Sequence, residues 1–533
     1  MTEGKDLLQI LWDGADVLRG KMDANEYKTY LLGLVFYKYL SDDYLATAYD
    51  LLNDKVPADL DEAQAAYEEA FHSDEKKELL NELKNSLHYT LDPDMTYVTM
   101  LNAAKENRFS REKLQAAFNR IHESDELFNG LFADVDLYST RLGTGEQKQS
   151  DTISDLIKVL ANADLIHAEG DVLGNAYEYL IGQFASETGK KAGEFYTPHG
   201  PAQLLCRIAM IGQENKKGLL VYDPCMGSGS LMLSCKHYSN EPDYIQYYGQ
   251  ELMPSTYNLA RMNMFLHRVH PEHQHLRNGD TLDADWPHDE ETEFDVVTMN
   301  PPYSAKWSAA EGFKQDERFM DYGGKLAPKS KADYAFLLHG FYHLKQTGTM
   351  AIVLPHGVLF RGASEGAIRQ KLLENGSIYA VIGLPSNMFY NTSIPTCIVV
   401  LKKHRDGRDV LFIDASKLYV KEKKQNIMQE EHIDRVLELY KNRKPVEKEA
   451  YLASYDDIVS NDFNLNIPRY VDTMEEEPEI DMKDLTRRIR ETDKAIKEEN
   501  ASLLNMLRDL ECSTEDTKDA ISEFIRILEE LLV

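Results

Sequence analysis

The fold of this chain is decided by the stretch Phe294-Asp295-Val296-Val297-Thr298-Met299-Asn300-Pro301-Pro302-Tyr303. Its first six residues form a short, mostly apolar run, which is typical of a buried parallel strand. Two consecutive prolines cannot continue a sheet ladder, because neither has an N–H to donate. The strand therefore ends here and presents Asn300 at its carboxyl end, where open α/β sheets place their ligands.

The chemistry of Asn300-Pro301-Pro302-Tyr303 suits an amino group as the acceptor of a reaction. The Asn300 side-chain oxygen and the Pro301 carbonyl can both accept hydrogen bonds from one exocyclic NH2 group. Held in this way, the nitrogen loses conjugation with its ring, and its lone pair turns toward an electrophile. Tyr303 offers a flat face on which a base can stack. A plain β-turn also uses Asn and Pro, so the surrounding motifs decide between the two interpretations.

Strands and helices alternate from about residue 200 onward. Predicted strands cover residues 219–222, 247–250, 294–299, 350–354, 378–384 and 397–401, and a further strand ends near Asp280. Predicted helices cover residues 201–211, 230–237, 255–267 and 332–344. Strands separated by helices imply crossover connections, and therefore an α/β fold with a mostly parallel sheet.

A glycine-rich segment, Asp223-Pro224-Cys225-Met226-Gly227-Ser228-Gly229-Ser230, follows the first of these strands. It lacks the third glycine of a dinucleotide fingerprint and the lysine of a P-loop. Gly227 and Gly229 allow the backbone to come close to a ligand. The Asp223 carboxylate at the strand end can pair with a ligand ammonium group.

Two more carboxylates follow the next two strands. Glu251 is placed to bind the two hydroxyls of a ribose, as acidic residues do at the second strand of nucleotide-binding folds. Asp280, in Asn278-Gly279-Asp280, could accept a hydrogen bond from an adenine N6 amine. A ligand that joins an adenosine to an amino acid and needs no phosphate site satisfies all of these groups. S-adenosylmethionine (S-adenosyl-L-methionine) fits this description.

The bulk composition limits the class of protein. A chain of 533 residues is too long for one ordinary domain, and its hydrophobic content of 43% can build several cores. No stretch reaches the roughly 18 consecutive apolar residues of a membrane span, and the first residues show no secretory signal. Five cysteines without a CxxC pair or metal-ligand spacing fit reduced thiols in a cytoplasm and predict no metal site.

The net charge of −31 restricts how the chain could bind DNA, because phosphate contacts need Lys and Arg. Either nucleic acid is not the substrate, or a partner supplies much of the affinity. The loop between Tyr303 and Ala332 is locally basic and interleaves lysines with Trp307, Phe313 and Phe319. Base contact and a merely solvated loop both fit this composition.

Both ends of the chain predict helices. Residues 1 to about 165 carry apolar residues at helical spacing, without strand-like alternation or a chemical motif. After a linker predicted at Glu475-Glu476-Glu477-Pro478, apolar residues recur every seven positions at Met482, Ile489, Ile496, Leu503 and Leu510. This stripe predicts a coiled coil or a helix that packs on a partner. An intramolecular helical hairpin that closes on the main domain is the alternative.

Taken in order, these motifs resemble those of the modification (M) subunits of type I restriction–modification systems, which are DNA adenine-N6 methyltransferases. The resemblance covers nearly the whole chain. Asp223 to Ser230 resembles the glycine motif of that family, Glu251 its ribose-binding acid, and Asn300 to Tyr303 its catalytic tetrapeptide. Two further segments resemble the family, Glu194-Phe195-Tyr196-Thr197-Pro198 ahead of the glycine loop and Asn461-Asp462-Phe463-Asn464-Leu465-Asn466-Ile467-Pro468-Arg469-Tyr470 before the C-terminal helices.

The resemblance implies a Rossmann-like methyltransferase domain with a mostly parallel, seven-stranded sheet. It implies an N-terminal helical domain (residues 1–165), a catalytic domain (166–470) and a C-terminal helical partner-binding segment (471–533). Catalytic roles are implied for Asn300, Pro301, Pro302 and Tyr303. Cofactor-binding roles are implied for Glu194, Phe195, Tyr196, Thr197, Pro198, His199, Asp223, Gly227, Ser228, Gly229, Ser230, Glu251 and Asp280.

The expected function is transfer of a methyl group from S-adenosylmethionine to adenine N6 of a base flipped out of DNA. The implied partners are a specificity (S) subunit that reads the sequence, a second M subunit and a restriction (R) subunit. Such delegation of base recognition would account for the acidic chain. Two alternatives stay open: an N-P-P-Y methyltransferase acting on RNA or on a protein glutamine, and a non-catalytic cofactor-binding scaffold. The intact tetrapeptide at Asn300 argues against the scaffold.

Overall fold

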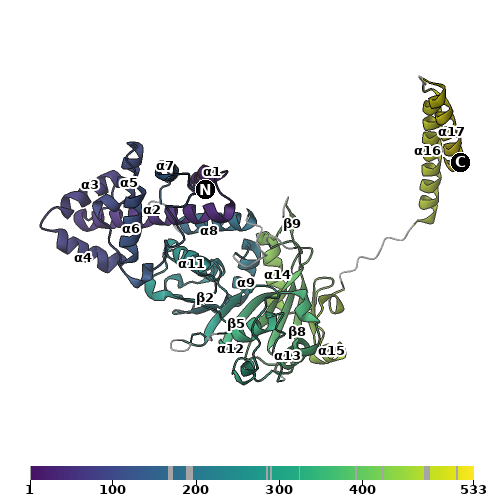
Figure 1. The fold of residues 1–533 in the computed structure, drawn as a ribbon. Helices are drawn as coiled ribbons and strands as arrows, with labels where there is room; N and C mark the ends of the chain where they lie inside the picture. Colours follow the sequence, from purple (N-terminus) through teal and green to yellow (C-terminus); the bar gives the residue numbers. More distant parts are fainter. Residues whose placement is uncertain are drawn as a thin grey trace. The chain divides into compact units, whose positions relative to one another are not determined.

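The computed structural model describes residues 2–165, 172–187, 196–283, 286–287, 291–322, 324–389, 393–422, 425–472, 481–511 and 514–532 (Figure 1). Contacts within the chain divide it into two compact units, Met1–Thr473 and Met474–Val533, and each is described by itself. In the described ranges, no helix combines the length and the apolar character that crossing a membrane requires.

The first unit begins with helices, as the sequence predicted. They are α1 (Thr2–Leu18), α2 (Ala24–Asn53), α3 (Leu60–Phe71), α4 (Lys76–Leu87), α5 (Tyr97–Lys105), α6 (Arg111–His122) and α7 (Glu146–Leu160). Every residue of α2 from Leu31 to Leu40 is buried, so this stretch has no solvated face and the other helices pack around it. Lys38 lies in that stretch, and its charge is neutralised by a buried ion pair with Asp42.

The core of these helices extends beyond residue 165. It includes α8 (Val172–Glu187) and one face of α11 (Pro254–Leu266), the helix that follows the second strand of the sheet. Phe265 of α11 stacks on Phe128 with ring centroids 5.1 Å apart. Arg261 of α11 donates hydrogen bonds to the carbonyls of Leu127 (2.6 Å) and Asn129 (2.7 Å). The N-terminal helices therefore pack on the sheet domain through α11, by an apolar core and by the hydrogen bonds of Arg261.

A large sheet forms the centre of the first unit, with the strand order β11-β8-β6-β7-β5-β4-β1-β2-β3. The strands are β1 (Leu220–Asp223), β2 (Gln246–Glu251), β3 (Gln274–Asn278), β4 (Phe294–Met299), β5 (Leu344–Pro355), β6 (Ile378–Gly383), β7 (Thr396–Leu401), β8 (Val410–Asp414) and β11 (Ala450–Ala453). Two short strands, β9 (Val420–Lys421) and β10 (Asn426–Ile427), pair with each other separately.

The sheet is mostly parallel, which confirms the predicted fold class. Five of its eight neighbouring pairs are parallel, and β7 runs antiparallel to both β5 and β6. The predicted number of seven strands is wrong, because β8 and β11 extend the sheet beyond β6. β8 pairs parallel with β6, and β11 pairs antiparallel with β8.

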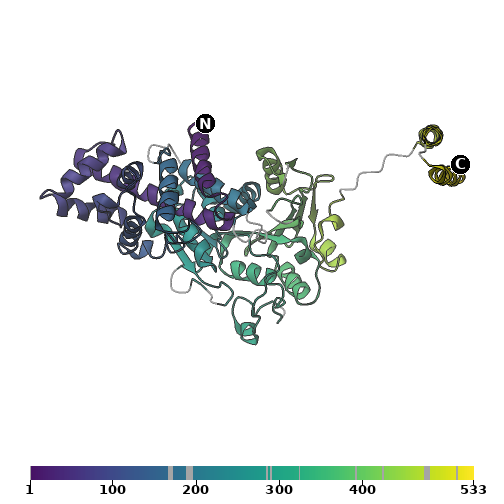
Figure 2. The same ribbon diagram turned by 45° about the horizontal axis from the view of Figure 1, so that its top comes forward.

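Helices cover both faces of the sheet (Figures 1 and 2). One face, which includes Tyr222 and Val297, packs against α12 (Asp333–Tyr342), α13 (Ala363–Glu374) and α15 (Tyr455–Ser460). The opposite face, which includes Val221 and Val296, packs against α9 (His199–Met210), α10 (Ser230–Leu233) and α14 (Glu430–Asn442). Adjacent residues of one strand thus point into different cores, which explains why these strands are apolar throughout.

Strand β4 has the bounds that the sequence predicted, Phe294–Met299. Its one charged residue, Asp295, is fully buried near the amino end of the strand. The Asp295 carboxylate accepts a hydrogen bond from the backbone N–H of Leu220 (3.1 Å) and pairs with Lys216 and Lys345. A buried carboxylate is tolerated there because both of its oxygens have partners.

The second unit is a pair of helices, α16 (Met482–Arg508) and α17 (Glu515–Leu532), which contact each other. An Arg508–Glu529 ion pair joins them. The predicted heptad stripe is left uncovered, since Ile489, Ile496 and Leu503 keep 59%, 53% and 45% of their surface exposed. The predicted linker at Glu475–Pro478 lies outside the described residues. Within this unit the two helices therefore form a hairpin, and their contact with each other does not bury the stripe.

Candidate active site at the carboxyl edge of the sheet

The tetrapeptide lies at the end of β4, next to the two strands that carry the other predicted site residues. Asn300 is buried, and its side-chain Nδ2 donates a hydrogen bond to Oγ1 of Thr197 (3.1 Å). Thr197 lies just before α9, more than a hundred residues earlier in the chain. The structure thus brings together the segment that contains Thr197 and the tetrapeptide that begins at Asn300, as the sequence analysis expected of one site. The contact also leaves the Asn300 side-chain oxygen on the side away from Thr197.

The hydroxyl of Tyr303 donates a hydrogen bond to Oδ1 of Asn300 (2.8 Å). The Tyr303 ring meets Phe389 edge to face, with centroids 6.0 Å apart. Burial raises the pKa of Tyr303 well above its ordinary value, so the hydroxyl keeps its proton and acts as a donor. An amide oxygen has two lone pairs, and Oδ1 of Asn300 therefore keeps the capacity to accept one more hydrogen bond.

The glycine motif makes a tight turn between β1 and α10. Gly227 (φ 55°) and Gly229 (φ 79°) both adopt left-handed backbone conformations that disfavour a side chain. The turn is braced from behind, because Nδ2 of Asn263 in α11 donates to the carbonyl of Ser228 (3.1 Å). The Ser228 and Ser230 hydroxyls lie 2.9 Å apart and are hydrogen-bonded to each other.

Glu251 joins the glycine turn to the end of β2. Its carboxylate accepts hydrogen bonds from the backbone N–H groups of Gly227 (3.2 Å) and Met253 (2.8 Å). The end of β3 is tied to the same place, since the N–H of Gly279 donates to the carbonyl of Glu251 (3.0 Å). Asp280 follows directly and is exposed; its Oδ1 accepts from the N–H of Leu282 (3.0 Å). The three predicted carboxylates therefore stand at one edge of the sheet.

The environment of Asp223 perturbs the acidity of its carboxyl group. It is almost completely buried, and its Oδ1 accepts a hydrogen bond from the N–H of Cys225 (2.9 Å). Burial, together with the negative charge of Glu251, raises the pKa of Asp223 to about 8, although the hydrogen bond from Cys225 lowers it. A carboxyl group in this state is ready to ionise when a cation is placed beside it.

Comparison with protein families gives a match to the family described as N-6 DNA methylase over residues 168–479. This segment contains all of the strands and the whole of the predicted site. The chain belongs to the N-6 DNA methylases. Residues 7–160 match a second family, the HsdM N-terminal domain. The predicted family and enzyme class, an adenine-specific DNA methyltransferase, are confirmed.

Individual relatives of this N-6 DNA methylase agree. The chain is 34% identical to the type I restriction enzyme MpnII methylase subunit of Mycoplasma pneumoniae, over 94% of this chain and 95% of that protein. It is 32% identical to the MjaVIII methylase subunit of Methanocaldococcus jannaschii, over 89% and 79% of the two chains. A crystal structure of a type I methyltransferase subunit from Streptococcus thermophilus matches with a TM-score of 0.87 at 56% identity, over 88% of this chain and all of that one.

The remaining residues of the predicted cofactor segment, 194–199, differ in their surroundings. Glu194 and Phe195 lie outside the described residues. Tyr196 packs against Gly182 of α8, where a side chain would come within 3.1 Å of its ring. Pro198 is buried and leads into α9, whereas His199 is exposed.

Sequence reasoning missed Asn263, Thr281 and Gln250, whose side chains hold the strand ends of the site in place. Asn263 holds the glycine turn. Thr281 donates from its hydroxyl to the carbonyl of Pro224 (2.6 Å) and to Oε1 of Gln250 (3.2 Å). These contacts tie the ends of β1, β2 and β3 together. No local pattern points to them, because each partner lies on another strand or helix.

The loop after the tetrapeptide is organised by its aromatic residues. Trp307 and Phe319 are buried, and together with Phe313 they form a cluster of three rings whose centroids lie 5.3 to 5.9 Å apart. The buried rings pack inward, so stacking on a base is not their role. Within the described part of this loop the exposed lysines face solvent, at Lys306, Lys314, Lys325 and Lys329.

Proposed function

We propose that this edge of the sheet binds S-adenosylmethionine and passes its methyl group to the N6 nitrogen of an adenine held by Asn300. The observation that carries the proposal is the Thr197–Asn300–Tyr303 hydrogen-bonded set at the end of β4. It holds a buried amide in one orientation, next to the carboxylates at the ends of β1 and β2. When bound, the cofactor supplies an electrophilic methyl group on a sulfonium sulfur.

The residues present fit such a cofactor. Asp223 is a buried carboxyl group with a raised pKa, which an ammonium group would stabilise in its ionised form. Glu251 is only half-buried at the end of β2, where a ribose hydroxyl can approach its carboxylate beside the N–H groups of Gly227 and Met253. Asp280 is exposed and available to an adenine amine. The left-handed glycines 227 and 229 keep the intervening backbone free of side chains on the cofactor side.

The chain's own residues then position the acceptor. Oδ1 of Asn300 and the carbonyl of Pro301 accept the two hydrogens of the adenine amine, and the two prolines keep the strand from continuing past these acceptors. Tyr303 gives the flipped base a face to stack on, and its hydroxyl helps to fix the Asn300 amide. Most of the acceleration comes from holding the reacting groups together in a fixed orientation.

The partners follow from the family and from the charge of the chain. We propose that a specificity subunit reads the DNA sequence and that a second M subunit and a restriction subunit join it. The relatives are named as subunits of restriction enzymes, which supports this reading. The exposed stripe of Ile489, Ile496 and Leu503 is proposed as the contact with the specificity subunit, because soluble surfaces rarely leave such a stripe in water. We also propose domain boundaries at residues 165 and 470, with α8 of the catalytic domain packing into the core of the N-terminal helices.

The test is a methyl-transfer assay with radiolabelled cofactor and DNA, using the chain together with the specificity subunit of its own system. Digestion of the DNA should release the label as N6-methyladenine. Label in RNA, in protein or in another base would refute the proposed acceptor. Thr197→Val and Thr197→Ser form a matched pair, since only serine keeps the hydroxyl that orients Asn300. The serine variant should retain transfer and the valine variant should lose about tenfold, the scale of one buried hydrogen bond.

A further inference from the structure

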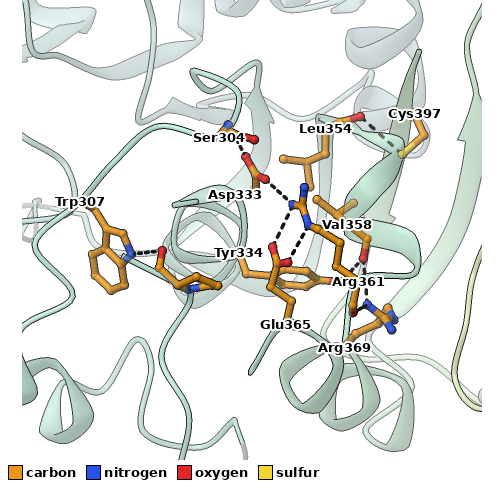
Figure 3. A network of polar contacts seen from close by, with 11 residues as sticks. Ser304, Trp307, Asp333, Tyr334, Leu354, Val358, Arg361, Glu365, Arg369 and Cys397 are labelled. Carbon is orange, nitrogen blue, oxygen red and sulfur yellow. Dashed lines mark hydrogen bonds and ion pairs between the residues drawn. The ribbon is translucent and has the colours of Figure 1, made fainter. Parts of the chain in front are cut away.

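The backbone directly after the tetrapeptide is held by a buried carboxylate. Ser304 has a φ of 53°, in the left-handed region that residues with a side chain rarely adopt. Its N–H donates a hydrogen bond to Oδ1 of Asp333 (2.7 Å), the first residue of α12 (Figure 3). Asp333 is completely buried. A strained conformation persists only where its surroundings fix it, and this contact fixes the residue next to Tyr303.

Asp333 is held in turn by an arginine. Its second oxygen pairs with Arg361, whose guanidinium also donates to both oxygens of Glu365, at 2.6 and 2.9 Å (Figure 3). The guanidinium lies against Gly357, where a side chain would come within 2.6 Å of it. A guanidinium directs donors from separate nitrogens at two carboxylates, whereas a lysine has all of its donors on one nitrogen and lacks this planar fork.

A second arginine extends the network toward the C-terminal part of the domain. Arg369 donates to the carbonyls of Arg361 (2.9 Å), Val358 (3.0 Å) and Phe463 (2.8 Å). Phe463 belongs to the segment from Asn461 to Tyr470, which the sequence singled out but to which the transfer reaction gives no role. Figure 3 shows Arg369, Arg361 and Asp333 in succession, leading to Ser304. Hydrogen bonds through Arg369, the residue Arg361 and Asp333 therefore join that segment to Ser304, the residue directly after the tetrapeptide.

We propose that Asp333 is a positioning residue for the catalytic tetrapeptide and that Arg361 and Arg369 brace it against the Asn461–Tyr470 segment. The inference rests on the proposed function, because it concerns the same tetrapeptide. Asp333 touches neither substrate nor cofactor in this account. It fixes Ser304, and through the chain it fixes the Tyr303 ring and the acceptor oxygens that precede it. Catalytic groups need such a supporting layer to stay within a fraction of an ångström of their working positions.

Asp333→Asn tests the proposal, and Asp295→Asn is its matched control. Both aspartates are fully buried, both accept a backbone N–H, and both pair with cations, but Asp295 lies at the opposite end of β4. Each variant is assayed in the assembled enzyme, in single turnovers at saturating cofactor and DNA. The asparagine has one acceptor oxygen where Asp333 has two, so its NH2 group must face either the Ser304 N–H or the Arg361 guanidinium. Asp333→Asn should therefore transfer methyl groups about 10- to 100-fold more slowly than Asp295→Asn, the scale of a small misplacement of reacting groups. Cofactor affinity by calorimetry should stay within about twofold of wild type in both.

Arg361→Lys is the second variant, for the case that Asp333→Asn does not fold. It keeps the charge beside Asp333 but loses the two-carboxylate geometry, so the rate of transfer should fall while cofactor affinity is retained. Transfer by either folded variant within about threefold of Asp295→Asn would overturn the proposal. Loss of cofactor affinity in parallel with rate would also overturn it, since that result indicates a general structural role. Absence of transfer by the wild-type enzyme would instead refute the proposed function.

Discussion

The raised pKa of Asp223 predicts that cofactor affinity depends on pH. The proposed ammonium partner needs the ionised carboxylate, but a carboxyl group with a pKa of about 8 is mostly protonated at neutral pH. Binding must therefore release a proton from Asp223, and affinity should rise with pH. An α-amino group with an ordinary pKa of about 7.7–8.0 stays charged between pH 6 and pH 7, so the ligand itself adds little slope there.

The size of the effect follows from the ionised fraction of Asp223. That fraction is roughly 1% at pH 6 and roughly 9% at pH 7 for a pKa of about 8. The dissociation constant should consequently fall about tenfold over this interval, or about 1.4 kcal/mol.

The raised pKa of Asp223 also makes the free energy of unfolding depend on pH. Because the pKa in the folded protein is above the unfolded value of about 3.9, the stability contributed by this group is full at acid pH and is lost as the pH rises toward about 8.

Isothermal titration calorimetry of S-adenosylmethionine at pH 6.0, 6.5 and 7.0 measures the predicted slope. Asp223→Asn is the control, since an amide keeps the acceptor for the N–H of Cys225 but cannot ionise. The variant should bind with an affinity that is nearly independent of pH in this range. A flat profile for the wild-type protein, or an undiminished slope in the variant, would refute the assignment of Asp223 as the ammonium partner.

Three further predictions concern the cofactor, the DNA and the C-terminal helices. Glu251→Ala should weaken cofactor binding by about 1.5–3 kcal/mol, the range for hydrogen bonds to a charged group, and unchanged affinity in calorimetry would place the ribose elsewhere. The chain purified alone should bind DNA weakly and with little sequence preference because of its net charge of −31; tight, site-specific binding in a mobility-shift assay would contradict delegated recognition. Removal of residues 481–533 should leave cofactor affinity intact and abolish co-elution with the specificity subunit in size-exclusion chromatography, and continued assembly would show that the exposed stripe is not the contact.

Much of the fold could be predicted because local rules decide it. Strand β4 was predicted to the residue, since an apolar run sets its start and Pro301 and Pro302 set its end. The alternation of strands and helices likewise led to a mostly parallel sheet. Strand β8 was missed although Val410-Leu411-Phe412-Ile413 is a plain apolar run. Edge strand β11 has a weaker pattern, and its pairing with β8 depends on a partner far away in the sequence.

The residues of the candidate site could be predicted from the sequence, but the contacts between them could not. Motifs at strand ends identified Asp223, Glu251, Asp280 and Asn300, because parallel strands bring their carboxyl ends to one edge. The contacts that position these residues join segments that are distant in the sequence, and no local pattern predicts such contacts. Examples are the hydrogen bond from Asn300 to Thr197 and the one from Ser304 to Asp333. The roles of the individual residues toward the cofactor stay predictions until a ligand is bound.

The measurement that tests the central claim most directly is single-turnover methyl transfer by Asn300→Ala in the assembled enzyme. The proposal assigns Asn300 to the acceptor nitrogen and the carboxylates at the ends of β1, β2 and β3 to the cofactor. The variant should therefore bind S-adenosylmethionine with nearly wild-type affinity and show no detectable transfer to adenine. Transfer within tenfold of the wild-type rate would contradict the claim that Asn300 holds the reacting amine.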